Sequence, residues 1–109
     1  AHWRFKTPRE AVISSNRIFG MYLDYRDEGD FIGMDMCRKF LEMGFTRSRR
    51  YANHKTGKKY DEKGNVRPQE PDHMTNKFAE SAKVFKKVRD IVAKSDDYVR
   101  MRKQWRASE

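Results

Sequence analysis

The side chains with the most informative chemistry lie in one short stretch, residues 46–59. Six of these fourteen residues are Lys or Arg, and none is Asp or Glu. Arginine can bind a phosphate through two hydrogen bonds, tyrosine can stack on a base, and asparagine can bind a base edge. Cations without compensating acids also attract polyanions. The candidate nucleic-acid-binding residues are Arg47, Arg49, Arg50, Tyr51, Asn53, His54, Lys55, Lys58 and Lys59.

The spacing within this stretch is compatible with a short helix over residues 47–54. Such a helix places Arg47, Arg50 and His54 on one face, where the cations would contact phosphates and the histidine would add a polar contact. With the preceding helix and a turn at Gly44, it would loosely resemble a helix-turn-helix. The plainer alternative is a solvated basic loop in a basic protein.

A second group of residues raises the question of catalysis. Pro71-Asp72-His73, with His54 before it and Asn76 after it, faintly resembles the core of a His-Asn-His metal nuclease. The paired cysteines or second helical histidine that would strengthen the match are missing. A histidine beside an aspartate at a helix start is more often a capping or surface group. We therefore expect non-catalytic binding, with no metal or other cofactor, and keep nuclease activity as a lesser alternative.

The composition sets the class of protein. The chain has 109 residues, which fit one domain over residues 1–109, and a net charge of +9. Residues 31–60 alone hold eight basic and two acidic residues. The apolar runs are too short for a transmembrane helix, so no membrane partner is expected. The single cysteine, Cys37, fits a reducing, cytoplasmic location and is expected to be a buried thiol.

Local signals divide the chain into helices. Five are expected: between Thr7 and Gly29, between Asp30 and Gly44, over residues 47–54, from Asp72 or Thr75 to about residue 94, and after Ser95. Residues 55–71, with Gly57, Gly64 and two prolines, predict an irregular basic loop that could hold a small hairpin. The predicted fold is mostly α, a compact bundle of four or five helices, with Phe40 and Phe85 in its core.

Several motifs resemble a known family. They are His2-Trp3-Arg4-Phe5-Lys6-Thr7-Pro8, Gly29-Asp30-Phe31, residues 38–47 and Arg50-Tyr51-Ala52-Asn53-His54. Together they are similar to family 4385 of the domains of unknown function, whose members occur in bacteria and their phages. Members carry an additional N-terminal segment before the first motif, so the resemblance implies that this chain is a piece of a slightly longer protein. The family has no assigned activity, and the resemblance implies no catalytic residues.

Two classes of function remain at this point. The first is a non-catalytic DNA- or RNA-binding protein that uses the stretch at residues 47–59. The second is a phage or bacterial protein that binds or inhibits another protein, in which case the basic stretch would meet an acidic face of that partner.

Overall fold

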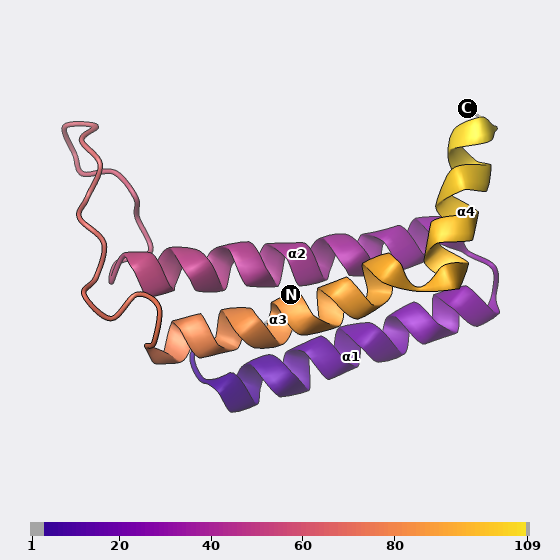
Figure 1. The fold of residues 1–109 in the computed structure, drawn as a ribbon, viewed down its shortest axis with the longest axis horizontal. Coiled ribbons are helices and arrows are strands. Elements are labelled where there is room, and N and C mark those ends of the chain that lie inside the picture. The colour runs from indigo at the N-terminus through magenta and orange to yellow at the C-terminus, as the bar shows by residue number, and fades with distance from the viewer. Residues whose placement is uncertain (1–3, 109) are drawn as a thin grey trace.

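The computed structural model describes residues 4–108, which form four helices and no strand longer than a single bridge. The helices are α1 (Pro8–Asp27), α2 (Phe31–Asn53), α3 (Lys77–Lys94) and α4 (Asp96–Ala107). Figure 1 shows α1, α2 and α3 side by side, with α4 rising from one end of this bundle and the segment between α2 and α3 rising from the other. The prediction of a mostly α bundle is confirmed. None of the four helices is long and apolar enough to cross a membrane.

The predicted helix starts depend on short polar side chains that bind free backbone N–H groups. The Thr7 hydroxyl accepts from the Glu10 N–H, the Asp30 carboxylate accepts from the Gly33 N–H, and the Ser95 hydroxyl accepts from the Tyr98 N–H. These contacts satisfy donors that have no partner within the helix. Gly29 follows α1 at a φ of +70°, a conformation that glycine adopts without steric cost. His2 and Trp3 of the first family motif lie outside the described residues.

The predicted end of a helix at Gly44 is wrong. Helix α2 continues through Gly44 to Asn53, so the expected short helix at 47–54 is its last two turns and there is no helix-turn-helix. Gly44 is buried, and a Cβ atom placed on it would lie 2.6 Å from the ring of Phe85 in α3. The glycine therefore serves close packing between α2 and α3 rather than helix termination.

Helix α3 begins later than predicted, at Lys77 rather than at Asp72 or Thr75. The Asn76 side chain sets this start, because its oxygen accepts from the Ala79 N–H at 2.9 Å. Its amide nitrogen donates to the backbone carbonyl of Ala52 in α2, also at 2.9 Å. One side chain thus caps α3 and joins it to the end of α2.

The core explains how a chain with few aliphatic residues folds. Small residues at the helix interfaces, among them Ala11, Ser15, Gly33, Gly44, Ser48, Ala79, Ser81 and Ala82, are buried and let the helices approach closely. Larger side chains then fill the centre: Ile18, Tyr22, Met34, Leu41, Phe85 and Val92. Phe85 is fully buried as predicted, whereas Phe40 is only partly buried at the edge of this core.

Helix α4 contacts α2 both near its start and near its end. The Tyr98 hydroxyl donates to the Asp35 carboxylate of α2 at 2.6 Å, and Trp105 packs against Phe31 with 5.8 Å between ring centroids. Burial alone raises the pKa of Asp35, but hydrogen bonds from Tyr98 and Arg38 outweigh it and hold that pKa below its ordinary value. This ionised carboxylate links α4 to the rest of the fold.

Candidate nucleic-acid interface

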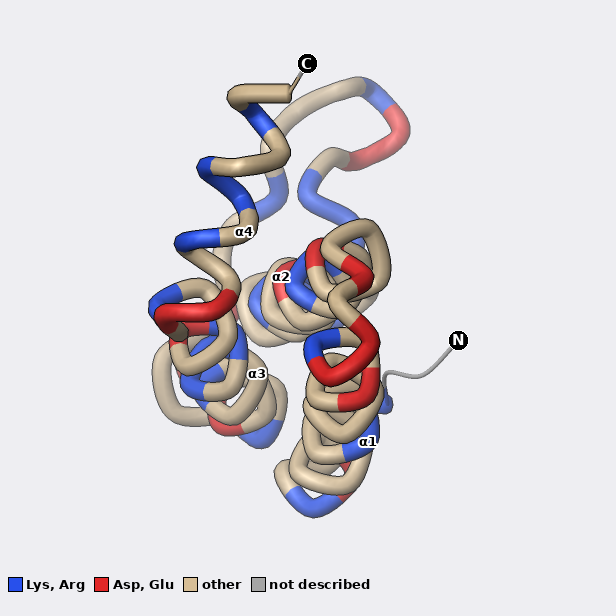
Figure 2. The backbone as a smooth tube through the Cα atoms, turned by 90° about the vertical axis from the view of Figure 1, so that its right-hand side faces the viewer, with Lys and Arg blue, Asp and Glu red and all other residues tan. Residues whose placement is uncertain are grey.

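The nine predicted residues lie at one end of the molecule, where α2 runs into the projecting segment of residues 54–76 (Figure 1). Helix α2 carries five of them on its last two turns, and the other four follow in the segment. Figure 2 shows Lys and Arg positions on this segment and on α4, the two parts that project from the bundle. The structure thus brings the basic stretch to the surface at a protruding end.

Most of the predicted cations are exposed. Arg47, Arg50, Lys55, Lys58 and Lys59 all have exposed side chains. Among residues 4–108, the ion pairs lie elsewhere than at Arg50 and the three lysines, for example between Arg89 and Glu42. Their charge is therefore directed at solvent, where it can act on an approaching anion.

Two predicted residues instead hold the end of α2 together. The Arg49 guanidinium is half-buried and donates to the Asn53 side-chain oxygen at 2.6 Å, and it also lies 3.9 Å from the sulfur of Met74. The Asn53 backbone carbonyl accepts from the Glu70 N–H at 2.7 Å. Both side chains are within one turn of the exposed cations, but their hydrogen-bonding groups are partly committed to the fold.

His54 does not lie on the exposed face that the helical spacing predicted for it. Its side chain is only 7% exposed, and its Nδ1 atom has no partner among the described residues. The chain returns past the end of α2 at residues 67–71 and covers this histidine, which the spacing along the helix alone does not reveal. The side chain is thus not exposed beside Arg47 and Arg50, and its contact with nucleic acid stays a prediction.

The projecting segment is held by its own hydrogen bonds. Tyr60 and Val66 form a single antiparallel bridge, which is the small hairpin that the sequence predicted. The Asp61 carboxylate accepts from the N–H groups of Lys63 and Asn65, both at 2.9 Å. These bonds close the turn at the tip of the segment.

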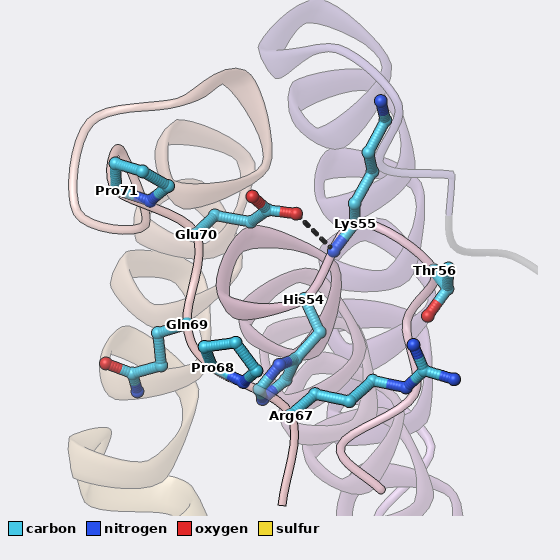
Figure 3. A pocket seen from close by; sticks show the side chains of 8 residues that line it. All are labelled: His54, Lys55, Thr56, Arg67, Pro68, Gln69, Glu70 and Pro71. Carbon is cyan, nitrogen blue, oxygen red and sulfur yellow. Dashed lines mark hydrogen bonds between the residues drawn. The ribbon is translucent and has the colours of Figure 1, made fainter. Parts of the chain in front are cut away.

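A hollow of about 340 Å³ lies between the start and the end of this segment (Figure 3). Its lining residues are His54, Lys55, Thr56, Arg67, Pro68, Gln69, Glu70 and Pro71. Across it, the Glu70 carboxylate accepts from the Lys55 N–H at 3.0 Å. Because this bond joins residues at the two ends of the segment, it keeps the basic side chains close to the end of α2.

Within the nuclease-like motif, a structural role is clear for Asn76. Asn76 caps α3, and the Nδ1 atom of His73 is buried without a partner among the described residues. No group of three or more His, Cys, Asp or Glu side chains within residues 4–108 is placed to hold a metal ion.

The structure also brings in aromatic residues that sequence reasoning did not assign to the site. Tyr51 lies 5.4 Å from Phe5 and 5.5 Å from Phe78, measured between ring centroids. In the sequence, Phe5 stands between Arg4 and Lys6, which is a local signal that could have linked it to a basic site. Nothing local links Phe78 to Tyr51, because only the folded chain brings them together.

Comparison with known proteins gives a lineage for this arrangement. No curated protein and no solved structure gives a significant match. The family model described as Domain of unknown function (DUF4385) matches residues 1–108. The additional N-terminal segment that the resemblance implied stays a prediction. Since the family match spans nearly the whole chain, the protein belongs to the DUF4385 family.

Proposed function

We propose that this protein binds nucleic acid without catalysing a reaction on it, through the exposed cations at the end of α2 and in the segment of residues 54–76. The observation that carries the proposal is the placement of Arg50, Lys55, Lys58 and Lys59 at one protruding end, all exposed. The three lysines have no recorded carboxylate partner within residues 4–108. Exposed cations without carboxylate partners can contact the phosphates of a nucleic acid, and the hydrogen bonds within the segment hold them on a projecting surface.

The strength of such binding follows from the release of counterions. Each phosphate that a Lys or Arg neutralises frees condensed cations, so affinity falls as salt rises. The overall charge of +9 adds long-range attraction to this local effect. No base-specific recognition is needed for this mode of binding, and we propose none.

The test compares two variants with the same change in charge. The first replaces Lys55, Lys58 and Lys59 by Gln in the basic segment. The control replaces Lys83, Lys86 and Lys87 by Gln on the exposed face of α3, away from the site. Fluorescence anisotropy with labelled oligonucleotides at low salt should show a loss of affinity of about tenfold or more in the first variant and a much smaller loss in the control.

Two results would contradict the proposal. One is no binding of any oligonucleotide by the wild type at low salt. The other is an equal loss in both variants, which would mean that net charge alone drives the association. Recovery of intact oligonucleotide after incubation with Mg²⁺ is also expected, since the proposal includes no cleavage.

A second candidate is binding to an acidic protein, and a specific surface favours it. Ile32, Met36 and Met43 are 60%, 42% and 42% exposed and recur at helical spacing along α2. A protein partner could cover this apolar stripe while its acidic residues meet the basic end. This candidate predicts that binding survives nuclease treatment and is weakened by Met43→Lys.

A further inference from the structure

Three aromatic side chains from distant parts of the chain meet beside the basic segment. Phe5 comes from the lead-in to α1, Tyr51 from the last turn of α2, and Phe78 from the first turn of α3. Tyr51 is in ring contact with both of the others, and Phe5 and Phe78 lie 6.2 Å apart between centroids. We call Phe5, Tyr51 and Phe78 the aromatic cluster.

The ring of Tyr51 is held in place yet remains accessible. Its side chain is 36% exposed. Gly57 lies against it so closely that an added Cβ atom would be 2.7 Å from the ring, and Gly57 also has a φ of +72°. With Phe5 and Phe78 on its other sides, the ring has little freedom to turn. An exposed aromatic ring that is already fixed loses little entropy when a ligand stacks on it.

The aromatic cluster forms the walls of two hollows, of about 510 Å³ and 460 Å³. Tyr51 and Phe78 line both of them. The first hollow is completed by Lys55, Glu70, Asp72, Asn76 and Lys77, and the second by Arg4, Phe5, Lys6 and Glu10. Each hollow therefore combines aromatic surface with charged side chains of both signs.

The linings differ in charge, because two cations face two carboxylates in the first hollow and one carboxylate in the second. The Lys77 ammonium lies 5.2 Å from the centroid of the Phe78 ring. Two of the nearby carboxylates have internal partners, because Glu70 accepts from the Lys55 N–H and Asp72 from the Asn76 amide. The rings therefore supply the main binding surface of the hollows, and the exposed cations Lys55, Lys58 and Lys59 of the basic segment lie close by for the phosphates.

We propose that the two hollows beside Tyr51 and Phe78 receive unstacked bases of a single-stranded nucleic acid. This inference rests on the proposed function and names its substrate class. Bases in a duplex are already stacked on their neighbours and cannot reach a recessed ring, whereas bases of a single strand can. Stacking tolerates any base, so the expected preference is for single strands over duplexes without strong dependence on sequence.

The experiment measures the affinities for oligo-dT and for a duplex of equal length at the same low salt concentration. Wild-type protein should prefer the single strand. Tyr51→Leu, which keeps apolar volume but removes the ring, should weaken single-strand binding at least about fivefold and leave duplex binding nearly unchanged. Tyr51→Phe should bind as the wild type does. Trp105→Leu, which removes an exposed ring at the far end of the molecule, is the matched control.

The outcomes separate this inference from the proposed function. Equal or stronger duplex binding by the wild type, or an equal loss for both probes in Tyr51→Leu, would overturn the stacking site while leaving the phosphate contacts intact. No binding of either probe would overturn both proposals. If Tyr51→Leu unfolds, NMR spectra of the wild-type protein provide the test. Added oligo-dT should shift the ring-proton resonances of Tyr51 upfield. Resonances that do not shift in the saturated complex would refute stacking.

Discussion

Replacing Gly44 by Ala should destabilise this protein, although alanine is the better helix former. In an open helix the change stabilises by about 0.5–1 kcal/mol, because alanine loses less backbone entropy on folding. At residue 44, however, the new Cβ would lie 2.6 Å from two atoms of the Phe85 ring. Phe85 is fully buried, so its ring has no free space into which to move. The clash must therefore push α2 and α3 apart or force the ring off its rotamer.

The magnitude follows from these opposing terms. Added volume in a packed core costs about 1–3 kcal/mol, and the gain in helix propensity offsets up to about 1 kcal/mol of it. The net loss should reach up to about 2.5 kcal/mol, or up to roughly 10 °C in melting temperature for a domain of this size. Gly20 provides the control, since it lies exposed within α1 and an added Cβ meets nothing within 4 Å. Gly20→Ala should raise the melting temperature by roughly 2–4 °C.

Thermal unfolding of both variants, followed by far-ultraviolet circular dichroism, measures this difference. Opposite signs for the two substitutions are expected, with unchanged helix content before the transition. A Gly44→Ala variant that is stabilised as much as Gly20→Ala would refute the close approach of α2 to Phe85. It would also reopen the interpretation of Gly44 as the end of a helix.

Three further predictions concern the core and the position of α4. Tyr98→Phe should cost about 1.5–3 kcal/mol in urea unfolding, because it removes the 2.6 Å hydrogen bond to the Asp35 carboxylate. The pKa of Asp35 is lowered in the folded protein, so the ionised carboxylate stabilises the fold fully above the unfolded pKa of about 4, and this stabilisation is lost as the pH falls through the lowered value. Tyr98→Phe should therefore lose less stability on acidification than the wild type. Burial raises the pKa of the Cys37 thiol to about 11. A thiol reagent at pH 8 should therefore label the native protein far more slowly than it labels a cysteine peptide. Labelling faster than that of the peptide would mean that the thiol is not buried. Phe85→Ala should cost about 3–5 kcal/mol and Phe40→Ala clearly less, since only Phe85 is fully buried; equal losses would contradict the placement of Phe40 at the edge of the core.

The features that sequence reasoning found correctly are local ones. Thr7, Asp30 and Ser95 each bind an N–H group only a few residues away, so their capping role can be recognised in a short stretch of sequence. Gly29 is similar, because a left-handed residue after a helix is a local requirement. The same kind of signal predicted the mostly α fold.

The features that sequence reasoning missed depend on contacts with residues far away in the chain. Gly44 has the same local signature as a helix end, and only the ring of Phe85 explains why a glycine is needed there. His54 has the spacing of a surface residue, but residues 67–71 return to cover it. The meeting of Tyr51 with Phe78 likewise follows from how α2 and α3 pack. The basic stretch was identified because charge is a property of composition, whereas its division into exposed and structural residues required the fold.

The salt dependence of nucleic-acid affinity tests the central proposal most directly. The logarithm of the association constant for a short single strand should fall linearly with the logarithm of salt concentration, by about 0.7 for each phosphate neutralised. Replacing Lys55, Lys58 and Lys59 by Gln should make this slope shallower by roughly two units if each lysine contacts one phosphate. The α3 control with Lys83, Lys86 and Lys87 replaced should keep the wild-type slope. A wild-type slope near zero, or a slope that the loop substitutions leave unchanged, would contradict phosphate binding by this segment.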